Sequence, residues 1–166
     1  MISYEEAIAI ILEQAKLMPS RRMTLQEALG KAAAGNIRSP IQVPGFHNSA
    51  MDGFAVCSTL LATASKSSPV ALKIASAIAA GDSVTTCSDA GMTTQIMTGA
   101  AIPKPYDAVV PVELATHRDD KVFFSRPARA GDHIRNAGED VTNGQHILHH
   151  GERITPEIIM LLSAVG

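Results

Sequence analysis

Turn-forming residues interrupt the middle of this sequence about every ten residues, a spacing typical of short strands joined by turns. The interruptions include Gly81-Asp82, Gly91, Gly99 and the Pro-Lys-Pro segment at 103–105. The segments around them are short and apolar, and they read "FAV", "VALKIASAIAA", "TTQIMTG", "DAVVPVE" and "KVFFSRP". This pattern predicts a small, mostly β domain in the middle of the chain.

The beginning of the sequence carries helix signals instead. Ser3 and Glu6 have the S-x-x-E spacing of a capping box, and apolar residues then recur at helical spacing until Pro19. The same capping pattern begins the stretch "TLQEALGKAAAG" at residues 24–35. We therefore predict two helices in the first forty residues, the second ending at Gly35.

The end of the sequence is also helical, because Thr155 can cap a helix whose first residue is Pro156. Helical ends around a β middle predict an α+β protein. We expect an elongated, discontinuous domain made of residues 1–43 and 141–166, into which a mostly β domain, residues 44–140, is inserted. A short edge strand at 37–44 leads out of the helical part. The Ser/Ala-rich stretch "STLLATASKSSP" fits a short helix or a loop equally well.

Composition excludes several classes of function. Of the 166 residues, 46% are hydrophobic and the formal net charge is −2, which indicates a folded protein without the positive field that general nucleic-acid binding needs. No apolar run approaches the ~20 residues of a membrane span, and the first residues lack the basic lead of a signal peptide. A cytoplasmic protein is therefore expected. Cys57 and Cys87 do not form a CxxC pair, so we expect both to be reduced packing residues.

Three loops place polar or acidic side chains beside glycines and strands, where the backbone can turn sharply and approach a ligand. Their candidate residues are Asn48, Ser49 and Asp52 in "NSAMDG", Thr98 and Gly99 in "MTGA", and Glu139 and Asp140 in "AGED". Each loop also has an ordinary interpretation. Asp52 with its glycine can be a common turn, Thr98 can cap a turn, and the two acids can end a solvated loop.

A histidine cluster offers a weaker candidate site. His146, His149 and His150 lie close together in "QHILHHGE", and neutral imidazoles bind metals. The stretch also alternates like an exposed strand and turn, and no cysteine or acid lies at a zinc spacing. A structural role is the simpler interpretation.

The three loops match a known family. "VPGFHNSAMDGFAV" resembles the segment VPxFDNSAMDGYAV of the molybdopterin molybdenumtransferase family (MoeA type), which includes the C-terminal half of gephyrin. "IMTGAAIPKPYDAVVPVE" resembles its segment IMTGAPxPxGADAVVxxE, and "AGDHIRNAGEDVTNGQHILHHGERITPEIIMLLSAVG" resembles the stretch that closes its first two domains. The resemblance covers essentially the whole sequence in order.

The resemblance implies an elongated homodimer with a cleft shared between the second domain of one subunit and the third domain of its partner. There, adenylated molybdopterin would lose its adenylate in a Mg²⁺-dependent step and receive molybdate on its dithiolene sulfurs. The residues that align with the cleft-facing positions of the family are Asp52, Thr98 and Asp140. Asn48, Ser49, Gly99 and Glu139 would assist in binding the cofactor precursor. Asp52 would be the Mg²⁺ ligand, directly or through water.

Two departures limit the expectation. His47 stands where the family has Asp, which removes one negative charge near the site. The sequence also stops at Gly166, where the third, molybdate- and pterin-binding domain of the family would begin. We therefore expect the 166 residues alone not to insert molybdate. The alternatives are a non-catalytic dimerisation or partner-binding module, and a small metal carrier that uses the three histidines.

Overall fold

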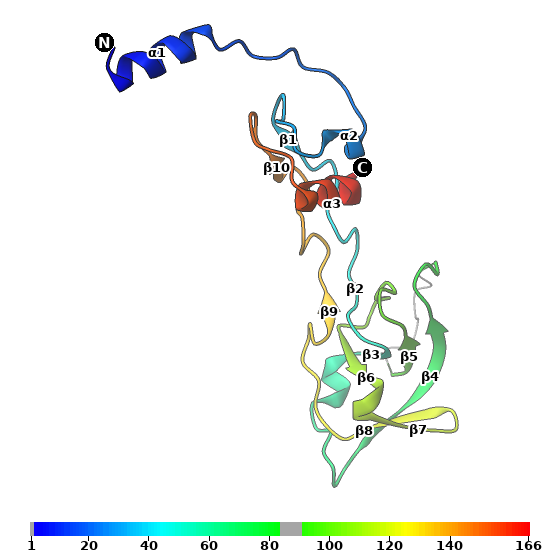
Figure 1. Ribbon diagram of the computed structural model, residues 1–166. Helices are drawn as coiled ribbons and strands as arrows, with labels where there is room; N and C mark the ends of the chain where they lie inside the picture. Colours follow the sequence, from blue (N-terminus) through cyan, green and yellow to red (C-terminus); the bar gives the residue numbers. More distant parts are fainter. Residues whose placement is uncertain (1, 84–90) are drawn as a thin grey trace. The chain divides into compact units, whose positions relative to one another are not determined.

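The computed structural model describes residues 2–83 and 91–166 (Figure 1). Two compact units can be distinguished. Residues 1–37 and 147–163 form the terminal unit, and residues 38–146 and 164–166 form the sheet unit. The predicted mixture of helices and strands is confirmed, whereas the elongated, discontinuous arrangement and its boundaries at 43/44 and 140/141 stay predictions. Cys87 lies outside the described residues. Among the described residues, no helix has the length and apolar character needed to cross a bilayer.

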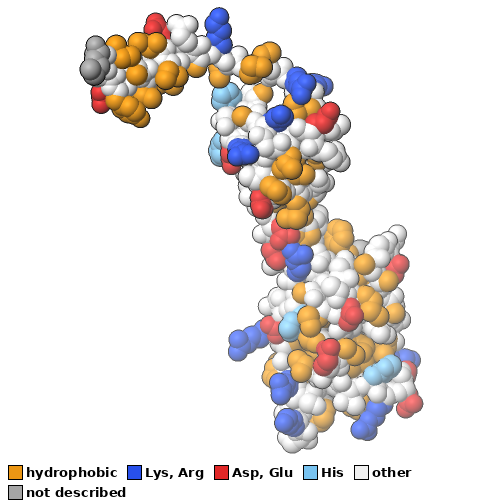
Figure 2. All heavy atoms as spheres, in the orientation of Figure 1, with side chains coloured by type: hydrophobic (Ala, Val, Ile, Leu, Met, Phe, Trp, Pro, Cys, Tyr) orange, Lys and Arg blue, Asp and Glu red, His pale blue; other side chains and the backbone are white. Residues whose placement is uncertain are grey.

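Helix α1 (Tyr4–Gln14) begins at the predicted capping box in the terminal unit. The Ser3 hydroxyl accepts a hydrogen bond from the Glu6 N–H, and the Glu6 carboxylate accepts one from the Ser3 N–H at 2.8 Å. The apolar side of α1 is uncovered, with Ile11 62% and Leu12 67% exposed. Figure 2 shows hydrophobic side chains along this helix. The apolar spacing therefore predicted the helix correctly, but no residue of this helix is buried in a core.

Helix α2 (Leu25–Ala28) is shorter than predicted, so its expected end at Gly35 is wrong. The predicted cap at Thr24 is present, but Gly30 adopts a positive φ of 76° two residues after the helix ends. The Gly30 N–H then donates to the carbonyl of Ile154 at 2.8 Å. This long-range backbone pairing within the terminal unit replaces the helical hydrogen bonds that the alanine-rich sequence favours.

Helix α3 (Pro156–Val165) begins at Pro156, as predicted. The Ile158 N–H donates to the Thr155 hydroxyl at 3.4 Å, which supports Thr155 as the capping residue. Strands β1 (Ile37–Arg38) and β10 (His146–Leu148) lie where the chain passes from one unit to the other. The predicted edge strand at 37–44 is therefore only two residues long.

In the part of the chain that the structure describes, the sheet unit contains one curled six-stranded sheet (Figure 1). Its strands, in spatial order, are β6 (Ala108–Pro111), β3 (Gly53–Val56), β5 (Thr93–Ile96), β4 (Val70–Ile78), β8 (Lys121–Phe124) and β7 (Ala115–Arg118). Neighbours are antiparallel, except that β4 and β5 are parallel. The five apolar segments of the sequence supply all of these strands except β7.

Both faces of the sheet are covered by core residues. On one face Phe54 packs edge to face with Phe124, with ring centroids 6.2 Å apart, and Val56 belongs to the same cluster. On the other face Ala55 packs with Ile96. Alternate residues of β3 therefore enter two different clusters, as the pleat of a strand requires.

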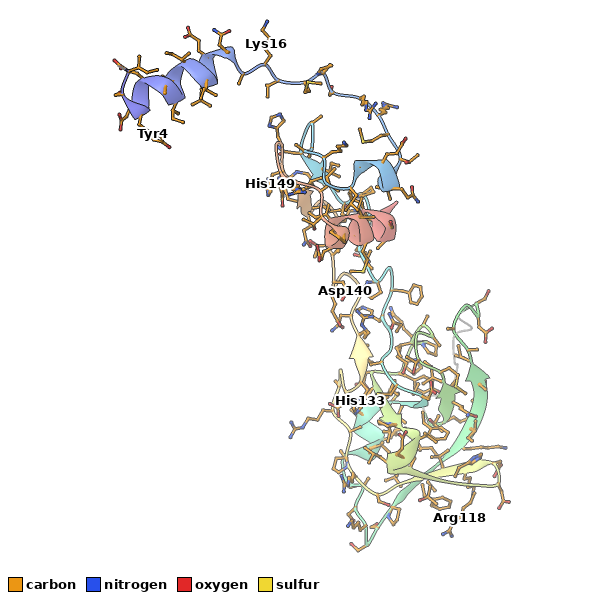
Figure 3. The ribbon with its side chains drawn as sticks, in the orientation of Figure 1. Tyr4, Lys16, Arg118, His133, Asp140 and His149 are labelled. Carbon is orange, nitrogen blue, oxygen red and sulfur yellow. The ribbon has the colours of Figure 1, made fainter. Side chains whose placement is uncertain are left out.

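Short elements complete the sheet unit. The undecided Ser/Ala-rich stretch forms a 3-10 helix, η1 (Ser58–Leu61), followed by turns, and a second one, η2 (Val112–Leu114), follows β6. At the end of β7, Arg118 lies over the ring of Phe123 at 5.8 Å (Figure 3). Strand β2 (Asn48–Ser49) pairs antiparallel with β9 (Ile134–Arg135). This small pair brings the first and third candidate loops close together.

Candidate functional site

The first and second candidate loops meet at Asp52 and Thr98. Asp52 Oδ1 accepts hydrogen bonds from the Thr98 backbone N–H at 2.7 Å and from the Thr98 hydroxyl at 2.8 Å. The pairing of β3 with β5, which aligns Gly53 with Ile96, places the two residues side by side. The Thr98 N–H, and to a lesser extent its hydroxyl, lower the pKa of Asp52. Asp52 is therefore an exposed carboxylate that is held in one orientation by Thr98 and stays ionised at neutral pH.

Gly53 explains why a glycine follows this aspartate. Gly53 lies in β3, and a Cβ atom there would overlap the carbonyl oxygen of Val110 and lie 2.9 Å from its carbonyl carbon. The glycine is thus required by close backbone contact with β6 and not by a positive φ. The Asp52 carbonyl also accepts from the Val112 N–H at 3.1 Å. Strand pairing therefore fixes the backbone on both sides of the Asp52 side chain.

Asn48, Ser49 and Gly99 hold the first two loops together. The Ser49 N–H donates to the Ala100 carbonyl at 2.9 Å, and the Gly99 N–H donates to the Ser49 carbonyl at 2.8 Å. Gly99 has a φ of 82°, which glycine adopts without strain. Ser49 is fully buried and Asn48 is 7% exposed. These contacts support a role for the three residues in shaping the loops.

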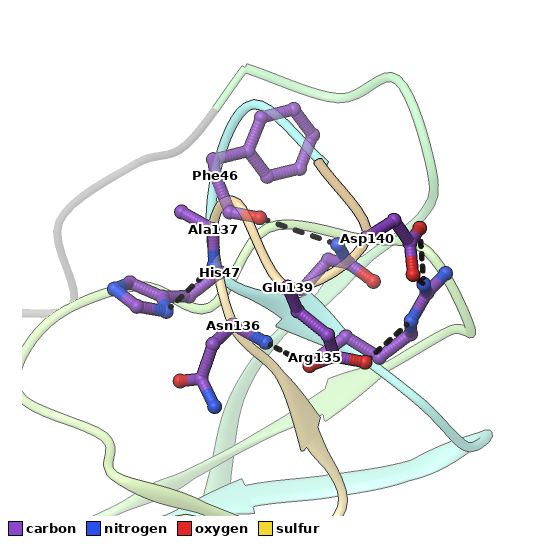
Figure 4. A network of polar contacts seen from close by, with 8 residues as sticks. Phe46, His47, Arg135, Asn136, Ala137, Glu139 and Asp140 are labelled. Atoms are coloured by element: carbon purple, nitrogen blue, oxygen red, sulfur yellow. Dashed lines mark hydrogen bonds and ion pairs between the residues drawn. The ribbon is translucent and has the colours of Figure 1, made fainter. Parts of the chain in front are cut away.

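The third loop forms an ionic cluster around Arg135, a residue that the sequence analysis did not select (Figure 4). Its guanidinium donates to both oxygens of Asp140, at 2.7 and 2.6 Å, and its Nε donates to Glu139 at 3.3 Å. The hydrogen bond to Asp140, followed by that to Glu139, raises the pKa of Arg135. An arginine four and five residues before two acids is the sequence signal that would have identified it.

Main-chain contacts shape this loop further. Glu139 accepts from the Asn136 N–H at 2.7 Å, and the Gly138 N–H donates to the Pro44 carbonyl at 2.9 Å. Gly138 has a φ of 75°, so a glycine is favoured there. The Ala137 N–H donates to Nδ1 of His47 at 3.3 Å. The turn is thus fastened to the segment that precedes β2.

All seven predicted site residues lie in the sheet unit, and four of them belong to two groups of side-chain contacts. Asp52 with Thr98 forms one group. Glu139 and Asp140, together with Arg135, form the other, which Figure 4 shows. Strand β2 links them, because Asn48 is aligned with Arg135 on one side and with Ala101 on the other. Within the described ranges, no hydrogen bond or ion pair joins the two groups directly. The catalytic and binding roles of these residues stay predictions.

The histidine alternative receives no support from the geometry. Across residues 2–83 and 91–166, no group of three His, Cys, Asp or Glu side chains is arranged to hold a metal ion. His149 and His150 are exposed, and His146 is half-buried in β10.

Fold and loops together define a curled β domain that presents exposed carboxylates, each fixed by hydrogen bonds, on glycine-containing loops. Residues 2–166 match the family model described as the MoeA N-terminal region (domain I and II). The chain belongs to this family. It spans about two fifths of the length of the curated relatives it matches.

Named relatives agree with this assignment. A molybdopterin molybdenumtransferase from Synechococcus elongatus is 36% identical over 169 residues, covering 100% of this chain and 42% of the relative. Molybdopterin molybdenumtransferase 2 from Mycobacterium tuberculosis is 35% identical, covering 100% and 41%. The crystal structure of the molybdopterin biosynthesis moeA protein from Pyrococcus horikoshii OT3 superposes with a TM-score of 0.93 at 28% identity, covering 100% of this chain and 44% of that one.

Proposed function

We propose that this chain is the N-terminal part of a molybdopterin molybdenumtransferase, which inserts molybdate into adenylated molybdopterin during molybdenum cofactor biosynthesis. The proposal rests on family membership and on relatives that bear this enzyme name and align with the whole chain. The sheet unit would contribute one wall of the reaction site. The 166 residues alone would not catalyse molybdate insertion.

The structural observation that supports a site in this chain is the Asp52–Thr98 pair. A carboxylate held by two donors on one oxygen is ionised and oriented without being buried. Asp52 Oδ2 accepts no hydrogen bond from the residues that the structure describes, which leaves it available to a ligand. An oriented, exposed carboxylate of this kind could bind a cation that neutralises the charge of a substrate phosphate.

Mg²⁺ fits this donor set. Magnesium prefers oxygen ligands, keeps several waters, and is commonly bound through one or two carboxylates together with substrate phosphates. Asp52 Oδ2 would hold the ion directly or through water, and the bound ion would neutralise phosphate charge on the adenylated substrate. Thr98 keeps the carboxylate in place because its N–H and hydroxyl both donate to Oδ1 of Asp52. Asp140 is already paired with Arg135 and is less available as a ligand.

The proposal includes a homodimer and a cytoplasmic location.

A second candidate function, a non-catalytic dimerisation or partner-binding module, is favoured by one observation. Helix α1 has only 11 residues and none of them is buried. Isolated helices of that length are marginal in water, so association would stabilise α1.

A chimera tests the enzymatic proposal. Residues 1–166 would replace the matched region of the Synechococcus elongatus relative, and cofactor formation would be measured with adenylated molybdopterin, molybdate and Mg²⁺. We expect turnover, and a loss of at least about tenfold in kcat for Asp52→Asn. The control is Asp120→Asn, which removes an exposed carboxylate paired with Lys73. A folded but inactive chimera would contradict the proposal and leave the binding module as the better description.

A further inference from the structure

Phe46 is an exposed aromatic side chain in the loop before β2. It is 54% exposed, whereas the other three phenylalanines of the chain are buried or half-buried. Among the residues that the structure describes, no aromatic ring packs against that of Phe46. Figure 4 shows the ring outside the network of polar contacts. Packing within the sheet unit therefore does not account for an aromatic residue at this position.

Hydrogen bonds fix the backbone on both sides of Phe46. Before it, the carbonyls of Val43 and Pro44 accept backbone hydrogen bonds at 2.9 to 3.0 Å from the turn of residues 138–141. After it, the side-chain amide of Asn48 donates to the Phe46 carbonyl at 3.2 Å. The loop that presents the ring is thus ordered without a ligand, so a ligand that binds the ring would not have to pay the entropy of ordering it.

The turn that holds this loop also carries Glu139 and Asp140, which are paired with Arg135. One guanidinium and two carboxylates give this cluster a formal net charge of −1. A net negative charge repels a phosphate and attracts N–H groups. Each carboxylate oxygen can accept more than one hydrogen bond, so pairing with Arg135 leaves acceptor capacity. The surroundings of Phe46 therefore suit a flat ring with N–H donors on its edge.

We propose that Phe46 is a substrate-binding residue, on which an amino-substituted heteroaromatic ring stacks with its N–H groups toward Glu139 and Asp140. Stacking on an aromatic side chain is favourable for any such ring, because each has a π face. Adenylated molybdopterin contains two of them, the pterin and the adenine, and this choice of ligand rests on the proposed function. The phosphate charge would be neutralised at Asp52, away from the negative cluster.

NMR titration of the 166-residue protein with adenosine and, separately, with 6-hydroxymethylpterin tests the proposal. Neither probe carries a phosphate, so the result depends on neither Mg²⁺ nor turnover. With at least one probe at millimolar concentration, we expect upfield shifts of its ring protons and changes at the Phe46 amide. Phe46→Ala should weaken binding by about fivefold or more, the lower end of the effect of losing one base–aromatic stack. Phe46→Tyr keeps a ring and should bind like the wild type.

The matched control is Tyr4→Ala, which removes an exposed ring, 76% exposed, from the terminal unit and should leave binding unchanged. The β3 amide resonances should be the same in every variant and so report intact folding. The probe whose affinity falls in Phe46→Ala identifies the ring. Absence of wild-type binding to both probes, unchanged affinity in Phe46→Ala, or an equal loss in Tyr4→Ala would each overturn the proposal.

The two proposals fail separately. Phe46-dependent binding together with an inactive chimera would contradict the proposed function and leave the stacking site in place. An active chimera together with binding that does not depend on Phe46 would contradict only the stacking site.

Discussion

The Asp52 carboxylate is held by both hydrogen-bond donors of Thr98, although 46 residues separate the two in the sequence. The backbone N–H and the hydroxyl of Thr98 converge on one oxygen of Asp52, and the other oxygen accepts no hydrogen bond from the residues that the structure describes. The arrangement depends on the pairing of β3 with β5, which is formed within the sheet unit. A carboxylate on an exposed loop thereby obtains one orientation.

The titration of Asp52 should reveal this contact. Because Thr98 lowers its pKa, Asp52 contributes stability above the ordinary aspartate pKa, and that contribution is lost as pH falls through the lower folded value. We expect the side-chain carbon resonance of Asp52 to titrate below the ordinary range. Thr98→Val should raise the midpoint only part of the way, since the backbone donor is the larger cause and remains. Thr116→Val, in β7, should leave the midpoint unchanged, and an ordinary midpoint in the wild type would contradict the contact.

Gly53→Ala should destabilise the sheet unit. The added Cβ would meet backbone atoms of Val110 and Pro111, which cannot move without disturbing the β3–β6 pairing. We expect a loss of ~1–3 kcal/mol in the free energy of unfolding, measured in urea. The matched control is Gly45→Ala, where a Cβ would meet no described atom within 4 Å. Equal effects of the two substitutions would show that close backbone contact is not the reason for Gly53.

The pair formed by Arg135 and Asp140 should add little to stability. Their side chains are 42% and 47% exposed, and exposed ion pairs gain little because water and salt screen them. A double-mutant cycle with Arg135→Gln and Asp140→Asn should give a coupling of ~0.2–1 kcal/mol that falls in high salt. The longer and more exposed pair of Lys73 with Asp120, 3.6 Å apart, should couple less. A coupling well above this range would contradict the prediction that the pair adds little to stability.

Phe124 should carry a large part of the sheet unit's stability. Its ring is 1% exposed and packs against Phe54. Phe124→Ala should cost ~3–5 kcal/mol, because it removes a buried aromatic ring and leaves a cavity. Phe46, on the loop before β2, is 54% exposed, and Phe46→Ala should change stability by no more than ~0.5 kcal/mol. Thermal or urea unfolding of the two variants would separate these expectations.

Local signals in the sequence predicted the elements that depend on neighbouring residues. The capping boxes at Ser3 and Thr24 and the Pro156 start were correct, because a cap is a contact between residues three positions apart. The apolar segments of the β middle were correct for β3, β4, β5, β6 and β8. The length of α2 was wrong, because the backbone of Gly30 pairs with Ile154, far along the chain.

The sequence by itself determined the family and which loops carry polar side chains, since those properties are written in the order and spacing of residues. Only the tertiary structure decided which side chains meet. It joined Asp52 to Thr98, placed Arg135 between Glu139 and Asp140, and showed that Gly53 is required by Val110. Such contacts depend on strand register across tens of residues, which local propensity does not encode.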